Sequence, residues 1–82
     1  MDYTLYILRT NKNTLYTGIT NNLDKRLLDH KNKVGSKYMR SFSTFILVYK
    51  ECSLTKSDAL KREFIIKKLT KKQKEQLILI VQ

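Results

Sequence analysis

The chain has 82 residues, of which 41% are hydrophobic, with five tyrosines and three phenylalanines. This predicts one domain over residues 1–82 with one modest core, and it argues against a disordered chain. Seventeen Lys and Arg against seven Asp and Glu give a formal net charge of +10. We therefore expect a polyanionic partner, although surplus lysine that only keeps the protein soluble is the alternative.

The single cysteine and the first residues bear on the compartment. Cys52 alone cannot form an internal disulfide or a multi-cysteine zinc site, and we expect it in the core. Asp2 and Arg9 interrupt the start of the chain, which therefore does not resemble a signal peptide. No apolar run approaches the ~18 residues of a membrane span. These features favour a soluble cytoplasmic protein without a membrane partner.

The first part of the chain predicts a β-hairpin. Residues 3–10 alternate imperfectly between apolar and polar side chains, which suggests a strand that is partly covered on both faces. The polar residues 11–13 then separate it from a second alternating run over residues 15–20, so the two strands should be antiparallel. Tyr6 and Tyr16 can be neighbours on one face, or they can be an ordinary aromatic pair that stabilises the hairpin.

A helix is expected directly after this hairpin, capped by Asn21 or Asn22. Helical spacing gives it an apolar stripe formed by Leu23, Leu27 and Val34. Arg26 and His30, four residues apart, lie along one edge of this stripe. Tyr16 can point into the same corner. In the simplest alternative, Tyr16 fills a core gap, Arg26 extends its charge to water and His30 is a satisfied histidine at the edge of the core.

Residues 31–40 are expected to form a basic loop. Lys33, Lys37 and Arg40 give it positive charge, and Tyr38 lies between the last two. Its ring can stack on a nucleic-acid base or pack inward.

The second half predicts a third strand and two further helices. Residues 44–49 form an apolar run typical of a strand buried on both faces. Thr55 with Asp58, and Thr70 with Gln73, have the spacing of helix-capping pairs. The last helix should continue into the apolar residues 77–81. That segment can dock a partner or a second copy, although we expect a monomer.

Glu63 falls on the apolar side of the second predicted helix, between Ala59 and Leu60 on one side and Ile66 on the other. A carboxylate there costs free energy unless it is paired or binds a metal. Lys67, four residues on, offers an ion pair. The other possibility is a magnesium ion, which needs only one or two protein carboxylates when water and phosphate supply the remaining oxygens.

These residues together resemble the GIY-YIG nuclease superfamily, in its small single-domain, UPF0213-like branch, from about Tyr3 to Leu77. The likeness rests on an ordered set of segments. Thr4-Leu5-Tyr6 stands where the first motif has Gly-Ile-Tyr, and Tyr16-Thr17-Gly18 stands where the second has Tyr-Ile-Gly. Arg26, His30 and Glu63 follow in order, and residues 35–40 are similar to the Gly-x-Lys-Tyr-x-Arg loop of the small branch.

The resemblance implies an α+β fold in which helices flank a small three-stranded antiparallel sheet. It also implies a metal-dependent endonuclease that hydrolyses DNA phosphodiester bonds. Tyr16 would be the general base aided by Tyr6, Arg26 would stabilise phosphate charge, and His30 would relay or donate a proton. Glu63 would hold one Mg²⁺ or Mn²⁺ ion. Gly18 is the glycine of the second motif, and the expected nucleic-acid contacts are Lys33, Lys37, Tyr38, Arg40 and Lys67. The alternative is a weak or inactive nucleic-acid-binding module that acts with a partner.

Overall fold

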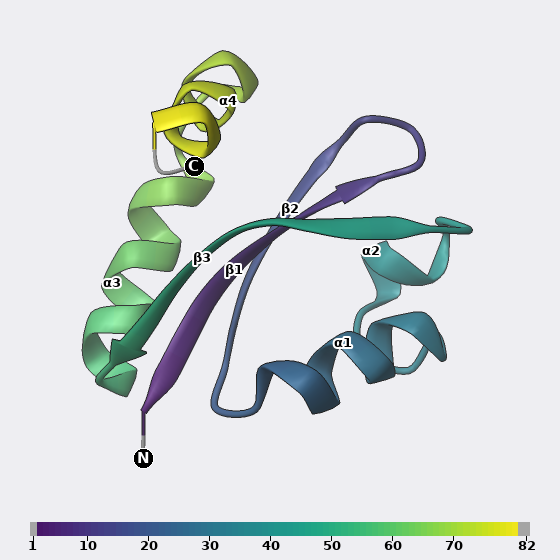
Figure 1. The fold of residues 1–82 in the computed structure, drawn as a ribbon, viewed down its shortest axis with the longest axis horizontal. Helices are drawn as coiled ribbons and strands as arrows, with labels where there is room; N and C mark the ends of the chain where they lie inside the picture. The colour runs from purple at the N-terminus through teal and green to yellow at the C-terminus, as the bar shows by residue number, and fades with distance from the viewer. Residues whose placement is uncertain (1, 81–82) are drawn as a thin grey trace.

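The computed structural model describes residues 2–80 and has the expected α+β architecture. In chain order the elements are β1 (Tyr3–Thr10), β2 (Leu15–Thr20), α1 (Leu23–Lys31), α2 (Lys37–Arg40), β3 (Phe45–Leu54), α3 (Lys56–Lys67) and α4 (Lys71–Ile80). The strands form one antiparallel sheet with the order β2-β1-β3. In Figure 1, α3 and α4 lie together at one side of this sheet, while α1 and α2 lie below the opposite half of β3.

The middle strand of the sheet is β1, and its residues Leu5 to Leu8 are all buried. Its register places Tyr6 opposite Gly18 and Leu8 opposite Tyr16. The prediction that the third strand is buried on both faces was wrong. β3 lies at the sheet edge and its pairing with β1 is interrupted by irregularities, so that Ile46 is 61% exposed.

The two faces of β1 support two separate apolar clusters. Leu5 and Ile7 pack with Tyr49, Ile66 and Ile78, which brings α3 and α4 onto one face. The second cluster, on the other face, is formed by Tyr6, Leu8 and Met39, with Tyr16, Leu23, Leu27, Phe42 and Phe45 packed against it. This second face therefore carries most of the residues singled out by the sequence.

Helix α1 begins as predicted and ends earlier than predicted. The Asn22 side chain accepts a hydrogen bond from the Lys25 N–H, which caps the first turn. At the other end, Lys33 adopts a φ of 64°, and the Val34 N–H donates to the Asp29 carbonyl. This arrangement ends the helix before Val34, which is 72% exposed and does not belong to the apolar stripe.

The segment expected to be a basic loop contains the short helix α2. The Ser36 side chain accepts a hydrogen bond from the Met39 N–H and starts this turn. Cys52 is exposed, contrary to its expected place in the core, because it lies on the edge strand β3.

Both predicted capping pairs begin helices. The Thr55 hydroxyl accepts a hydrogen bond from the Asp58 N–H at α3. Thr70 and Gln73 exchange reciprocal bonds at α4. None of the helices in the described part is long and apolar enough to cross a membrane.

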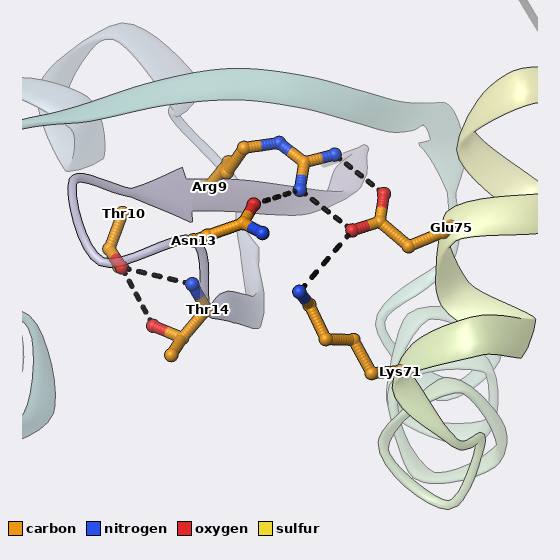
Figure 2. A network of polar contacts seen from close by, with 6 residues as sticks. All are labelled: Arg9, Thr10, Asn13, Thr14, Lys71 and Glu75. Atoms are coloured by element: carbon orange, nitrogen blue, oxygen red, sulfur yellow. Dashed lines mark hydrogen bonds and ion pairs between the residues drawn. The ribbon is translucent and has the colours of Figure 1, made fainter.

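A polar network joins α4 to the β1–β2 hairpin (Figure 2). Both terminal nitrogens of Arg9 donate to the Glu75 carboxylate, at 2.6 and 2.7 Å, and one of them also donates to the Asn13 side chain. Lys71 approaches the same carboxylate at 3.8 Å. The guanidinium of Arg9 lowers the pKa of the Glu75 carboxyl by hydrogen bonding to its charged form. The network thereby links the last helix to the sheet through Arg9 and Glu75, which are 66 residues apart in the sequence.

Candidate active site

Two tyrosines and the single histidine meet on the α1-covered face of the sheet. The Tyr6 hydroxyl oxygen lies 2.9 Å from His30 Nε2, and this contact is buried. The Tyr16 ring lies edge-on to the imidazole, with centroids 5.4 Å apart, and 6.3 Å from the Tyr6 ring. Since Tyr16 pairs with Leu8 and Tyr6 with Gly18, the two tyrosines are diagonal neighbours on one face.

Glycine is required at two positions because side chains of this cluster occupy the space beside it. A Cβ atom at Gly18 would lie 2.5 Å from the Tyr6 hydroxyl oxygen, and one at Gly35 would lie 2.8 Å from His30 Nδ1. The glycine of the second motif thus makes room for the tyrosine of the first. Gly35 does the same for the imidazole.

The environments of the two tyrosines differ. Tyr6 is only 1% exposed, and burial, aided by the neighbouring Tyr16, raises the pKa of its phenol far above the usual value. Tyr16 is half-buried, so its side chain reaches solvent. Of the pair, Tyr16 is the more exposed.

His30 is buried and held in its neutral form. Burial, with a further contribution from the Arg26 charge, lowers the pKa of the imidazole. When the Tyr6 hydroxyl donates to Nε2, the imidazole carries its proton on Nδ1. Within the described part of the chain, Nδ1 has no hydrogen-bond partner.

Arg26 and Glu63 lie on different helices, and each acts on Tyr6 through its charge. Arg26 lies on α1, one turn before His30, and its charge lowers the pKa of Tyr6, whereas the charge of Glu63, on α3, raises it. Of the five residues for which the sequence suggested catalytic or metal-binding roles, the structure places Tyr6, Tyr16 and His30 side by side.

Glu63 forms the ion pair that its spacing allowed. Its carboxylate lies 3.3 Å from Lys67 Nζ, and its side chain keeps 21% of its surface exposed. The neighbouring Ala59 and Ile66 are fully buried, whereas Leu60 is 47% exposed, so this side of α3 is only partly buried. Among residues 2–80 there is no cluster of three or more His, Cys, Asp or Glu side chains for a metal ion. A metal at Glu63 would therefore need water and phosphate oxygens as its other ligands.

Tyr38 packs inward, onto Tyr16. Their rings stack at a centroid distance of 5.8 Å and an interplanar angle of 15°. The Tyr38 hydroxyl donates a 3.0 Å hydrogen bond to the Thr14 hydroxyl on the hairpin. This stack covers one face of Tyr16, while the Tyr38 residue remains 45% exposed.

The other expected nucleic-acid contacts are exposed, but not all of their charges are free. Lys33 donates to the Phe42 carbonyl at 2.8 Å and approaches the Arg40 carbonyl at 3.5 Å, so its ammonium group fastens the segment after α2. Lys67 pairs with Glu63. Lys37 and Arg40, on α2, are exposed.

Sequence reasoning missed three apolar residues around this cluster. Met39 is buried beneath it. The Phe42 and Tyr38 ring centroids are 5.0 Å apart, and Phe45 lies edge-on to His30 with centroids 6.2 Å apart. The available signal was the spacing of three and four residues between the large apolar residues at 38, 39, 42 and 45, although only Lys37–Arg40 of this segment is helical.

Comparison with known proteins identifies the family. The family model of the GIY-YIG catalytic domain matches residues 2–76. A UPF0213 protein of Clostridium perfringens is 50% identical over 78 residues, which cover 95% of this chain and 83% of the relative. One from Cronobacter sakazakii is 40% identical over 77 residues, covering 94% and 81%.

Solved structures extend the likeness to the fold. The solution NMR structure of a UPF0213 protein from Bacillus halodurans has a TM-score of 0.65 and 34% identity, covering 98% of this chain and 85% of that one. A protein from E. faecalis, also solved by NMR, has a TM-score of 0.69 and 33% identity, covering 99% and 86%.

Proposed function

This chain belongs to the GIY-YIG nuclease family, among the UPF0213 proteins, and we propose that it is a metal-dependent endonuclease that hydrolyses phosphodiester bonds in DNA. The observation that carries the proposal is the buried contact between Tyr6 and His30, with Tyr16 against both rings. Two phenols and an imidazole in contact are groups able to exchange protons with a substrate, which supports a catalytic role.

Tyr16 is the proposed general base, because it is the tyrosine of the pair that reaches solvent. It would take a proton from the water that attacks the phosphorus atom. A phenol has an unperturbed pKa of about 10, so Tyr16 needs nearby positive charge in order to act as a base at neutral pH. Tyr6, which is buried, is a positioning residue that fixes the Tyr16 and His30 side chains.

Arg26 is proposed to bind the scissile phosphate. Its guanidinium would stabilise the negative charge that develops on the phosphate oxygens during attack. His30 holds the Tyr6 hydroxyl through Nε2, and we propose that this contact fixes the two rings beside Tyr16.

Nucleases of this family generally use a divalent metal ion, and Glu63 is the residue proposed to hold it. The donor set fits Mg²⁺ or Mn²⁺, since one partly exposed carboxylate leaves the other positions to water and phosphate oxygens. When bound, the metal supplies positive charge that stabilises the leaving oxygen. Lys67 approaches only one oxygen of the Glu63 carboxylate, so the other oxygen is the one proposed to bind the metal.

The overall charge of +10 supports a nucleic-acid substrate. Lys37 and Arg40 project from α2, the helix that also carries Tyr38, and we propose that they contact backbone phosphates beside the cleavage site. Such contacts position a strand without reading its sequence.

The test is a cleavage assay with end-labelled duplex, single-stranded and branched DNA, in magnesium, in manganese and in EDTA. The protein should cut at least one of these substrates, and cutting should be lost in EDTA and in the Tyr16→Phe variant. DNA binding in EDTA should persist in that variant, because its charged surface is unchanged.

A nucleic-acid-binding module without turnover is the second candidate, and the ion pair between Glu63 and Lys67 favours it. It predicts salt-sensitive binding without cleavage in any metal. Binding alone cannot separate the two candidates, whereas metal-dependent cleavage excludes the second.

A further inference from the structure

A cavity of about 530 Å³ opens beside His30, between α1 and the segment that leads from α2 into β3. Leu27 lines it from the helix, and Phe42 and Phe45 line it from the segment. In Figure 1 these elements lie together below one end of β3. The volume lies within the range typical of pockets for small organic ligands, which is about 300–1,000 Å³.

The cavity shares His30 with the candidate active site. One nitrogen of the imidazole contacts Tyr6, while the ring lies edge-on to Phe45 in the cavity wall. A group bound in the cavity is thus separated by one side chain from the tyrosine pair. That separation suits two neighbouring parts of a single ligand.

The lining combines apolar and polar side chains. Asp24 and Lys31 come from α1, and Ser43 and Thr44 come from the opposite segment. Together they offer a carboxylate, an ammonium group and two hydroxyls, that is, both hydrogen-bond donors and acceptors. Aromatic rings together with such polar groups suit a nucleobase, whose faces are apolar and whose edges carry both kinds of group.

The segment is fastened over the cavity by Lys33. The ammonium group of Lys33 also lies at the cavity, and its hydrogen bond to the Phe42 carbonyl holds this side of the opening in place. The cavity is therefore formed before any ligand binds, which lowers the entropic cost of binding.

We propose that this cavity receives one nucleobase of the bound DNA strand, unstacked from its neighbours, while an adjacent phosphate lies at Tyr16 and Arg26. The inference rests on the proposed function for the identity of the strand, but binding of the base requires no cleavage. A base fixed in this way determines which phosphate reaches the tyrosines. It also favours substrates in which bases are unpaired, since unstacking costs least there.

The first test is NMR titration of the intact protein with deoxyadenosine 5′-monophosphate, and separately with deoxyribose 5-phosphate and with indole. The nucleotide should shift the methyl resonances of Leu27 and Leu28 at the cavity, and the shifts should saturate. The fitted affinity should be at least about tenfold higher for the nucleotide than for either control compound, as expected for a stacked base. Equal affinity for deoxyribose 5-phosphate would mean that only the phosphate binds. Equal affinity for indole would mean an unspecific apolar pocket, and either result overturns the proposal.

A matched pair of variants tests the location. Leu28 is 55% exposed at the cavity, and Leu60 is 47% exposed on α3, so both positions can accept a larger side chain without disturbing the core. Leu28→Trp should weaken nucleotide binding at least about tenfold, whereas Leu60→Trp should leave it unchanged. Equal affinity in the two variants contradicts the proposed location.

Cleavage separates this inference from the proposed function. In a substrate that the protein cuts, an abasic site at one fixed position from the cut should reduce cutting at that phosphate, and abasic sites elsewhere should not. If DNA is cut without any such position and the nucleotide does not bind, the cavity proposal fails while the nuclease proposal stands. If the nucleotide binds but no DNA is cut, the nuclease proposal fails while the cavity proposal stands.

Discussion

The Tyr6 hydroxyl and His30 Nε2 lie 2.9 Å apart in a buried contact that joins the central strand to α1 across 24 positions of the chain. Because His30 is buried beside Arg26, the pKa of its imidazole is lower in the folded protein than its usual value. The burial of His30 therefore makes stability depend on pH.

We expect the free energy of unfolding to fall as the pH is lowered below about 6.5, the usual histidine pKa. In that range the unfolded chain takes up a proton at His30 more readily than the folded one, so acid favours unfolding. Urea denaturation between pH 5 and pH 8 measures the effect. His30→Gln should remove this dependence, because the chain has no other histidine. A wild-type stability that rises on acidification would contradict the assignment.

The two tyrosines should differ in their contribution to catalysis. We expect Tyr16→Phe to lower the single-turnover cleavage rate by at least about 100-fold, since it removes the proposed general base. Tyr6→Phe should cost less, roughly tenfold, because the buried ring remains and only the hydrogen bond to His30 is lost. A larger loss for Tyr6→Phe than for Tyr16→Phe would reverse the assigned roles.

Tyr38 should act through Tyr16. Tyr38→Phe keeps the ring stacked on Tyr16 and loses only the bond to Thr14, whereas Tyr38→Ala loses both. We expect Tyr38→Ala to reduce kcat roughly tenfold with little change in KM, and Tyr38→Phe to stay near wild type. A stack on substrate bases would instead raise KM in Tyr38→Ala. The chemical shift of the Tyr16 ring protons reports the lost stack independently of activity.

The Arg9–Glu75 pair should stabilise the docking of α4. Glu75→Gln should lower the free energy of unfolding by about 1 kcal/mol, since this paired but partly exposed bridge is worth little more. Lys71→Ala is the control, and its more distant contact predicts a loss below about 0.5 kcal/mol. Chemical denaturation measures both values, and equal losses would show that the bidentate geometry adds nothing.

Local chemistry in the sequence was sufficient to predict the hairpin and three helix starts. Asn22, Thr55 and Thr70 cap helices through side-chain oxygens that need no tertiary context. The place of β3 was not predictable in the same way, because an apolar run of this length fits both a central and an edge strand. Which strand lies in the middle depends on pairing between distant segments.

The candidate site was predictable as a set of residues but not as a structure. Spacing and family likeness suggested five residues, of which Tyr6, Tyr16 and His30 lie in one cluster. The stack of Tyr38 on Tyr16 depends on α2, which follows the end of α1 at Lys31 and a turn in which Lys33 is left-handed. Lysine gives little indication of such an end, and Gly35, two residues later, gives a misleading one.

The most direct test of the central claim is the cleavage rate of Glu63→Gln at increasing magnesium concentrations, beside Asp58→Asn on the same helix. Glutamine preserves the size of the side chain and removes its charge. We predict that Glu63→Gln loses at least about 100-fold in rate while Asp58→Asn cuts like wild type. If Glu63→Gln cuts DNA with the rate and magnesium dependence of wild type, Glu63 does not hold the metal and the proposed site is wrong.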